Sequence, residues 1–459
     1  MSGLDLPGWL QPALTYAARW IGFQMNAVEQ PGCAMAAVHG GQVVFEQAWG
    51  MADAGTGERL GTRHRFRIAS HSKTFTAAGI MLLRERGRLR LDDPVGEHVP
   101  DLHGEVAAAT IGQVLSHAAG LFRDGEDTGF WRLRGPFPDE ARVRAHLATE
   151  PAIGTGSRMK YSNYGFALAG LVIEHVTGEP WTQWIRREVV EAAGLHETEP
   201  DGTPGMSMLA HGHSGKQPLG RRVVIPGDMA TGHYAPATGF LSTPAETARF
   251  FALLDPGAPA SFLSPASRRE MTRPHWRVPH AAAERSYGLG TISGQTDGLD
   301  WFGHSGGFPG TLTRTSVVPG HSLAVSVFTN AIDGPSDGWM EGVLHILARF
   351  AREGAPDPAL ADWSGRWWSL WRAVDLVPAG RKVLIAVPAL AKPLDHAAEI
   401  EANGDEGVIA EAGGFASHGE KAHLRRGPGG GVERLWLAGD TMAPEAEAVE
   451  ELSGLLAGP

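Results

Sequence analysis

The sequence predicts an α+β protein in which helices pack on one antiparallel sheet, followed by a small C-terminal module rich in β-strands. Strand-like runs occur near both ends of the first 350 residues, helical patterns fill the interval, and the composition changes after residue 353. Strands at both ends with helices between them favour a single antiparallel sheet. With 459 residues, 42% of them hydrophobic, the chain is long enough for two or three domains.

Two hairpins are expected to contribute strands to the sheet. The first lies over residues 34–39 and 42–49, which flank a Gly-Gly pair, and the second lies over 311–318 and 322–330, which flank Pro-Gly. Such pairs are typical of tight turns between antiparallel strands.

Apolar residues recur at helical spacing before, between and after the hairpins. The segments with this pattern are 6–29, 74–86, 111–116, 165–176, 181–193, 244–254 and 340–352.

The composition change predicts two domains, residues 1–350 and 359–459, joined by the linker EGAPDP at 353–358. The second domain has short apolar runs separated by Gly-rich turns, a pattern typical of a small barrel-like β module. Its tryptophans, from Trp363 to Trp371, are expected in the core of the module rather than in a ligand cage.

Composition also excludes several classes of protein. The net charge of −11 argues against a nucleic-acid-binding protein, since phosphate binding needs clustered Lys and Arg. A single cysteine, Cys33, excludes an internal disulfide and a Cys-rich metal cluster. No apolar stretch is long enough for a membrane helix, and the N-terminus lacks the pattern of a signal peptide, so we expect no membrane partner and a cytoplasmic location. The composition does not exclude a homo-oligomer.

The first candidate site is Ser70-His71-Ser72-Lys73, directly before the helix over 74–86. Ser and Lys three residues apart at a helix start lie on one face, about one turn from each other. A partly desolvated lysine can take the serine proton, and the serine can then act as a nucleophile. The alternative is a serine N-cap with a solvated lysine, and a second match, Ser157 to Lys160, shows that this motif alone is weak.

The second candidate site is Tyr161-Ser162-Asn163. A phenol can relay a proton to a leaving group, and an Asn amide can hold both a lysine and a substrate carbonyl. The alternative is a simple turn into the helix over 165–176. This motif also sets Lys160 aside, because Ser157 and Lys160 adjoin it and open no amphipathic helix of their own.

The third candidate site, Gly303-His304-Ser305-Gly306-Gly307, allows two incompatible interpretations. As G-x-S-x-G it would be the nucleophile elbow of an α/β-hydrolase, which turns at once into a helix. The residues that follow, up to 318, are of β type, which disfavours the elbow. Alternatively, the segment begins a strand at the edge of an active site, where small residues admit a substrate.

In this order the three motifs resemble the S-x-x-K, Y-x-N and [KH]-[ST]-G boxes of the serine β-lactamase and penicillin-binding-protein superfamily. Residues 30 to 345 are similar to its class C β-lactamase-related branch, which includes esterases and D-aminopeptidases, and the resemblance implies a β-lactamase/transpeptidase-like fold. The similar stretches are RIASHSK (67–73), LDDPV (91–95), LSHAAGL (115–121), YSNYGFALAGLVIE (161–174) and TGFLSTPA (238–245).

The resemblance implies a role for each motif residue. Ser70 would be the acylated nucleophile, Lys73 its base, and Tyr161 would assist proton transfer to the leaving group. Asn163 would position Lys73 and the substrate. The backbone N–H groups of Ser70 and Gly307 would form an oxyanion hole.

The third box departs from the pattern of most β-lactamases, which have lysine where this chain has His304. His304, Ser305, Gly306 and Gly307 are expected to bind substrate, but a histidine is mostly neutral near pH 7 and holds a substrate carboxylate weakly. This favours small amides, peptides (D-amino-acid-containing ones included) or esters over penicillins. A β-lactamase or DD-peptidase, and a penicillin-binding protein that acylates without turnover, stay as alternatives.

No cofactor is implied, and no metal is expected. His211, His213 and His233 are better explained as loop histidines, because no further ligand has convincing spacing. His117 resembles the family's Ser-His-x-x-Gly turn and is expected to be structural.

Overall fold

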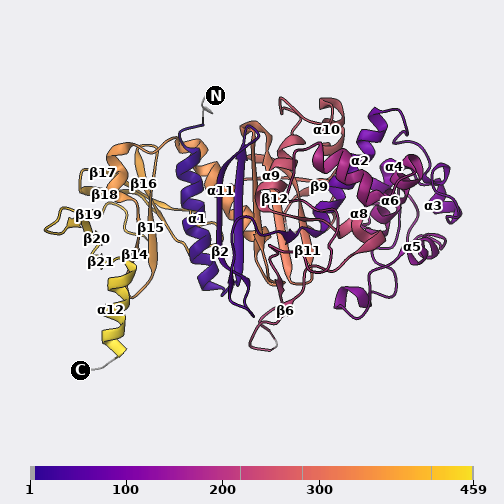
Figure 1. Cartoon of the computed structure of the whole chain (residues 1–459). Helices are drawn as coiled ribbons and strands as arrows, with labels where there is room; N and C mark the ends of the chain where they lie inside the picture. The colour runs from indigo at the N-terminus through magenta and orange to yellow at the C-terminus, as the bar shows by residue number, and fades with distance from the viewer. Residues whose placement is uncertain (1–5, 218, 282, 415, 457–459) are drawn as a thin grey trace. The chain divides into compact units, whose positions relative to one another are not determined.

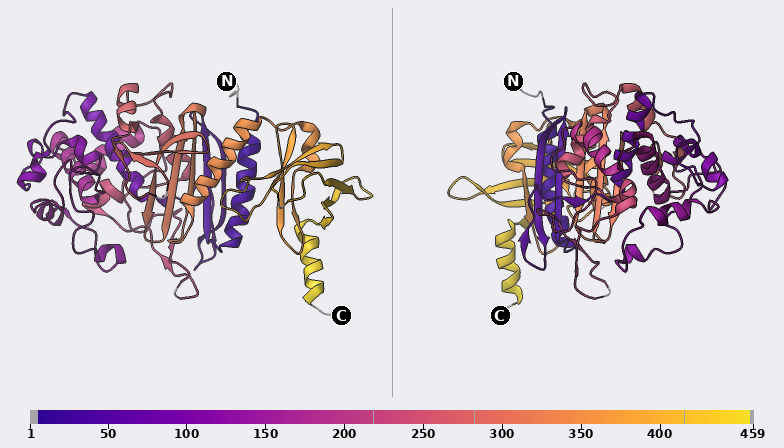
Figure 2. Two further views of the ribbon diagram at one scale, coloured as in Figure 1. Left: turned by 180° about the vertical axis from the view of Figure 1, so that it is seen from behind. Right: turned by 45° about the vertical axis from the view of Figure 1, so that its right-hand side comes forward.

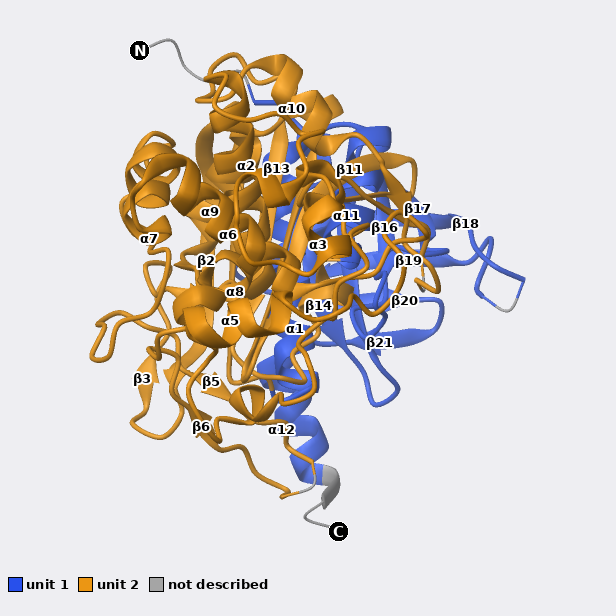
Figure 3. Cartoon of the chain, turned by 90° about the vertical axis from the view of Figure 1, so that its right-hand side faces the viewer, with its two compact units in different colours: residues 1–29, 341–459 blue, residues 30–340 orange. Residues whose placement is uncertain are grey.

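The computed structural model describes residues 6–456, except residues 218, 282 and 415. The chain divides into two compact units, a larger one of residues 30–340 and a smaller one of residues 1–29 with 341–459 (Figure 3). The predicted domain boundaries, 1–350 and 359–459, stay a prediction.

The larger unit contains the long antiparallel sheet. Its strands are β1 (Gly32–His39), β2 (Gln42–Asp53), β3 (Glu58–Arg59), β8 (Trp276–Arg277), β9 (Arg285–Tyr287), β10 (Ile292–Thr296), β11 (Leu299–Phe308), β12 (Thr311–Val318) and β13 (Leu323–Thr329). Two short ladders lie outside it, β4 (Phe66–Arg67) with β7 (Leu241–Ser242) and β5 (Gly212–His213) with β6 (Val224–Ile225).

Both predicted hairpins are confirmed. Among the described residues the strand order is β3-β2-β1-β13-β12-β11-β10-β9-β8. The first hairpin is β1 with β2 and the second is β12 with β13, and they join in the sheet where Cys33 pairs with Thr329. Strands from both ends of the larger unit therefore lie side by side, as the α+β prediction requires.

Helices of the larger unit gather beside the sheet (Figures 1 and 2). They are α2 (Ser72–Glu85), α3 (Gly104–Ala108), α4 (Ile111–Leu115), α5 (Glu140–Leu147), α6 (Asn163–Thr177), α7 (Trp181–Ile185), α8 (Ala235–Thr238), α9 (Pro244–Leu253) and α10 (Pro265–Thr272). Short 3₁₀ turns occur at η1 (Ala69–His71), η2 (Val95–Glu97), η3 (Gly129–Arg132), η5 (Gly232–Tyr234) and η6 (Pro319–His321). The helix expected over 181–193 is α7 followed by a π-helical segment, Arg186–Glu191.

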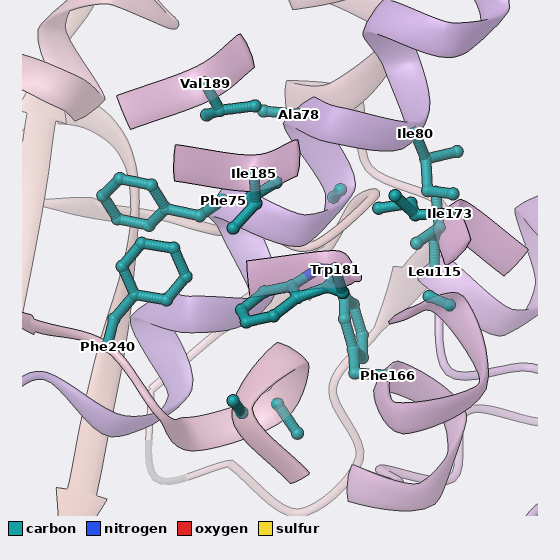
Figure 4. Close-up of a cluster of buried hydrophobic side chains, with 14 of the residues drawn as sticks. Phe75, Ala78, Ile80, Leu115, Phe166, Ile173, Trp181, Ile185, Val189 and Phe240 are labelled. Carbon is teal, nitrogen blue, oxygen red and sulfur yellow. The ribbon is translucent and has the colours of Figure 1, made fainter. Parts of the chain in front are cut away.

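Helix α2 is the centre of the helical layer, and its residues from Ser72 to Leu83 are all buried. Phe75 stacks on Phe240 at 4.3 Å and on Phe250 at 3.6 Å between ring centroids. Figure 4 shows Phe75 and Phe240 beside Trp181, within a cluster of buried side chains from several helices. Such packing fixes the first turn of α2, and with it η1, between the helices and β11.

The smaller unit is rich in β-strands, as predicted. It holds α1 (Leu10–Ala27), most of α11 (Ser336–Glu353), η7 (Pro358–Trp363), α12 (Glu445–Leu456) and a sheet of β14 (Gly365–Trp368), β15 (Ala373–Ala379), β16 (Lys382–Ala386), β17 (Ala398–Asn403), β18 (Glu406–Glu411), β19 (Lys421–Arg426), β20 (Val432–Leu437) and β21 (Asp440–Met442). These strands pair in chain order and form a near-barrel.

The tryptophans of this module do not all lie in its core. Trp363 is fully buried and Trp367 is 5% exposed, and both belong to the apolar cluster of the module. Trp371 is 88% exposed. The prediction of a buried group was therefore wrong for Trp371, because this residue lies between β14 and β15 rather than on a strand.

The described helices include none that is both long enough and apolar enough to span a membrane.

Candidate active site

The segment that carries Ser70 is held tightly between the sheet and α2. Ser70 lies in η1, and the preceding Ala69 has a φ of +46°, a conformation that non-glycine residues rarely adopt. On the sheet side, a Cβ atom on Gly306 of β11 would collide with the carbonyl oxygen of Ile68 and lie 2.5 Å from Oγ1 of Thr313. The glycine lets β11 approach the Ser70 segment closely.

Lys73 lies one turn beyond Ser70 and is fully buried. Its Nζ donates to Oδ1 of Asn163 at 2.7 Å and to the carbonyl oxygen of Ala237 at 2.8 Å. The same Nζ lies 3.1 Å from Oγ of Ser70. Burial holds the pKa of Lys73 well below its usual range. A neutral amine at this position donates its two N–H groups to Asn163 and Ala237, so its lone pair faces the Ser70 hydroxyl.

Tyr161 approaches the same hydroxyl from the segment that leads into α6. Its OH donates to Oγ of Ser70 at 2.7 Å, and its ring centroid is 4.8 Å from Nζ of Lys73. Burial raises the pKa of Tyr161 above its usual value. The phenol therefore stays protonated and can donate a hydrogen bond near the atom that would attack a substrate.

Asp124 belongs to the site although it was not predicted from the sequence. Its Oδ1 accepts from Nδ2 of Asn163 at 2.7 Å and from Nε1 of Trp131 at 3.0 Å. Because a carboxylate only accepts, it fixes the amide of Asn163 with its oxygen toward Lys73. Asp124 lies in a loop with no motif, so only its acidic character could have marked it.

His304 lies in β11 beside this group, but its ring is used inside the protein. It is 1% exposed, and its Nδ1 is 2.7 Å from the carbonyl oxygen of Ser305. A carbonyl only accepts, so Nδ1 carries the proton and Nε2 accepts from the OH of Tyr287 at 3.1 Å. Burial and the nearby His71 lower the pKa of His304, and its ring stays neutral. No motif in the sequence marks Tyr287.

The rest of the third box lies along the same strand. Ser305 pairs with Arg314 and Gly306 with Thr313 on β12, and Gly307, one residue from the end of β11, is exposed. The structure thus joins Ser70, Lys73, Tyr161 and Asn163 by hydrogen bonds, and lays Gly306 against the Ser70 segment.

Two alternatives from the sequence do not fit the structure. The G-x-S-x-G segment runs through the middle of β11 without the strand-to-helix turn of a nucleophile elbow. Ser157 lies outside any helix, and its hydroxyl donates to the carbonyl oxygen of Gly154. Ser157 and Lys160 therefore lack the helix-start arrangement of Ser70 and Lys73.

Of the loop histidines, His213 has hydrogen bonds within the fold. In the part of the chain that the structure describes, no group of three or more His, Cys, Asp or Glu side chains could hold a metal ion. Nε2 of His213 accepts from the N–H of Ala54, and its Nδ1 is 2.7 Å from the carbonyl oxygen of Asn330. His213 thus ties backbone segments together.

Comparison with known proteins agrees with this geometry. The beta-lactamase family model matches residues 18–342. Penicillin-binding protein 4 of Amycolatopsis lactamdurans is 30% identical over 315 residues, which are 65% of this chain and 81% of that protein. An octameric penicillin-binding protein homologue from Pyrococcus abyssi shares the fold, with a TM-score of 0.67 and 20% identity over 94% of this chain and 98% of that chain. A D-stereospecific amidohydrolase from Streptomyces sp. has a TM-score of 0.61 and 26% identity over 71% of this chain and 97% of its own. The chain belongs to the beta-lactamase family, whose members are serine hydrolases.

Proposed function

We propose that this protein cleaves a small amide or ester through a covalent acyl-enzyme on Ser70. The observation that carries the proposal is the convergence of two proton-transfer groups on one hydroxyl, with Nζ of Lys73 at 3.1 Å and the OH of Tyr161 at 2.7 Å from Oγ of Ser70. A nucleophile with a base and a proton donor in hydrogen-bond reach is the arrangement that acyl transfer needs.

The reaction would run in two halves. Neutral Lys73 takes the proton of Ser70 as Oγ bonds to the substrate carbonyl carbon, and the N–H groups of Ser70 and Gly307 receive the oxyanion. The proton then passes by way of Tyr161 to the leaving amine or alcohol, and the bond to it breaks. In the second half, water adds to the acyl carbon, its proton returns through the same groups, and the acid product leaves Ser70.

Charge favours amides and esters over penicillins. A penicillin carries a carboxylate. The ring of His304 offers it no positive charge, because burial lowers its pKa and keeps it neutral, and no free ring nitrogen, because both already bond within the protein. The likeness to a D-stereospecific amidohydrolase supports amide substrates, those built from D-amino acids included. The backbone of β11 at His304, rather than the imidazole ring, would then contact the substrate.

A panel of substrates tests this choice. We expect turnover of p-nitrophenyl esters and of D- or L-amino-acid amides, with weak hydrolysis of nitrocefin. Dominant hydrolysis of nitrocefin would instead favour the alternative, a β-lactamase or DD-peptidase. A burst of product with no steady-state turnover on any substrate would show a penicillin-binding protein that only acylates.

Two further predictions accompany this function. The Pyrococcus abyssi homologue is octameric, which supports a homo-oligomer for this chain. A cytoplasmic location also stays a prediction.

A further inference from the structure

The turn that contains His117 is built in an unusual way. It ends α4 in a Schellman motif, in which the N–H of Ala118 donates to the carbonyl oxygen of Gln113 at 2.7 Å and the N–H of His117 to that of Val114 at 3.2 Å. The residue at this position needs a left-handed backbone, and His117 has a φ of +60°. Glycine is the usual choice there, so the contacts of the histidine side chain decide whether it has a use beyond the turn.

His117 forms hydrogen bonds with the residues on both sides of Tyr161. Its carbonyl oxygen accepts from the N–H of Lys160 at 2.7 Å, and its Nδ1 accepts from the N–H of Ser162 at 3.2 Å. The residue between these two donors is Tyr161. The imidazole packs on the Tyr161 ring, with centroids 4.2 Å apart. Backbone and side chain of one residue thus hold the residues before and after Tyr161 and contact its ring.

The surroundings of His117 keep its ring in one protonation state. The ring is 1% exposed and packs on Tyr287 and Phe166, at 4.6 and 5.3 Å between centroids. Its Nε2 is buried without a hydrogen-bond partner among the described residues. Burial and the nearby Lys73, His304 and Arg123 hold the pKa of His117 well below its usual value. A neutral ring with the proton on Nε2 leaves Nδ1 free to accept from Ser162.

We propose that His117 is a positioning residue that aims the Tyr161 hydroxyl at Oγ of Ser70, and that it acts on leaving-group protonation rather than on the fold alone. This inference rests on the proposed function, because it needs Tyr161 to hand a proton to the leaving group. His117 itself does not touch the reacting atoms.

Two variants distinguish the contribution of the His117 side chain from that of its left-handed backbone. His117→Gly keeps the left-handed turn but removes the acceptor and the ring. His117→Asn also tolerates this backbone, and its Oδ1 can accept from the N–H of Ser162. Tyr161→Phe is the reference for loss of the phenol. All three are compared with the unchanged enzyme by melting temperature and by kcat/KM on an amide and on a p-nitrophenyl ester.

The leaving group gives the decisive readout. An amide needs protonation of its amine, whereas p-nitrophenolate leaves without it. We expect His117→Gly to lower kcat/KM about 100-fold on the amide, as general acid catalysis is lost, and only a few-fold on the ester. His117→Asn should keep amide turnover within a few-fold. In the Tyr161→Phe background, His117→Gly should add little further loss on the amide.

Equal losses on both substrates, or a full additional loss in the Tyr161→Phe background, would overturn the inference and show a merely structural role. Unchanged amide turnover in His117→Gly would overturn it too. If His117→Gly does not fold, His117→Asn still decides, since a folded Asn variant that loses amide and ester turnover equally contradicts the inference. Ser70→Ala is measured alongside. Turnover that survives Ser70→Ala rejects the proposed function, whereas its loss together with an unaffected His117→Gly rejects only the positioning role.

Discussion

Two neighbours of opposite charge act on the buried Lys73. Burial lowers the pKa of its ammonium group, the carboxylate of Asp124 raises it, and the guanidinium of Arg123 lowers it. His117, His304 and Tyr161 also face this amine. In the proposed mechanism Lys73 must be neutral to take the Ser70 proton, so we expect kcat/KM to rise as the pH passes the pKa of Lys73.

Opposite substitutions should therefore move the acid limb of the pH profile in opposite directions. Asp124→Asn removes a negative charge, lowers the pKa of Lys73 and shifts the rise to lower pH, while its amide oxygen can still accept from Asn163. Arg123→Gln removes a positive charge, raises that pKa and shifts the rise to higher pH. The measurement is kcat/KM for a p-nitrophenyl ester against pH. Shifts of the same sign, or none, would show that Lys73 is not the titrating base.

At the scale of elements, the close contact between β11 and the Ser70 segment organises the site. A side chain on Gly306 would meet the backbone of Ile68, which cannot give way, whereas one on Gly307 would meet only Cδ2 of Leu312 at 3.4 Å. The two neighbouring glycines thus differ in the space around them, a difference that the sequence alone does not reveal.

Gly306→Ala should force β11 away from η1. We expect the free energy of unfolding to fall by about 1–3 kcal/mol, as for other overpacked sites, and turnover to fall with it. Gly307→Ala is the matched control for stability and should stay within about 0.5 kcal/mol of the unchanged protein. Chemical denaturation of both variants measures this. Equal stabilities would mean that β11 has room to shift.

At the scale of the whole molecule, sequence patterns predicted the features that neighbouring residues form among themselves, such as hairpins and motifs. The hairpins β1–β2 and β12–β13 and the Ser70 and Tyr161 motifs follow from turn residues and from spacing along the chain. Asp124 and Tyr287 reach the site only because the fold brings a loop and strand β9 to it, and no spacing encodes that. Trp371 shows the same limit, since apolar character alone did not reveal that it would be exposed.

The central claim is that Ser70 forms the covalent bond. The most direct measurement is labelling of the full chain with a fluorophosphonate, followed by digestion and peptide mass spectrometry. We expect a single adduct on Ser70, complete loss of labelling and turnover in Ser70→Ala, and unchanged labelling in Ser305→Ala. An adduct on Ser305, or labelling that survives in Ser70→Ala, would contradict the account.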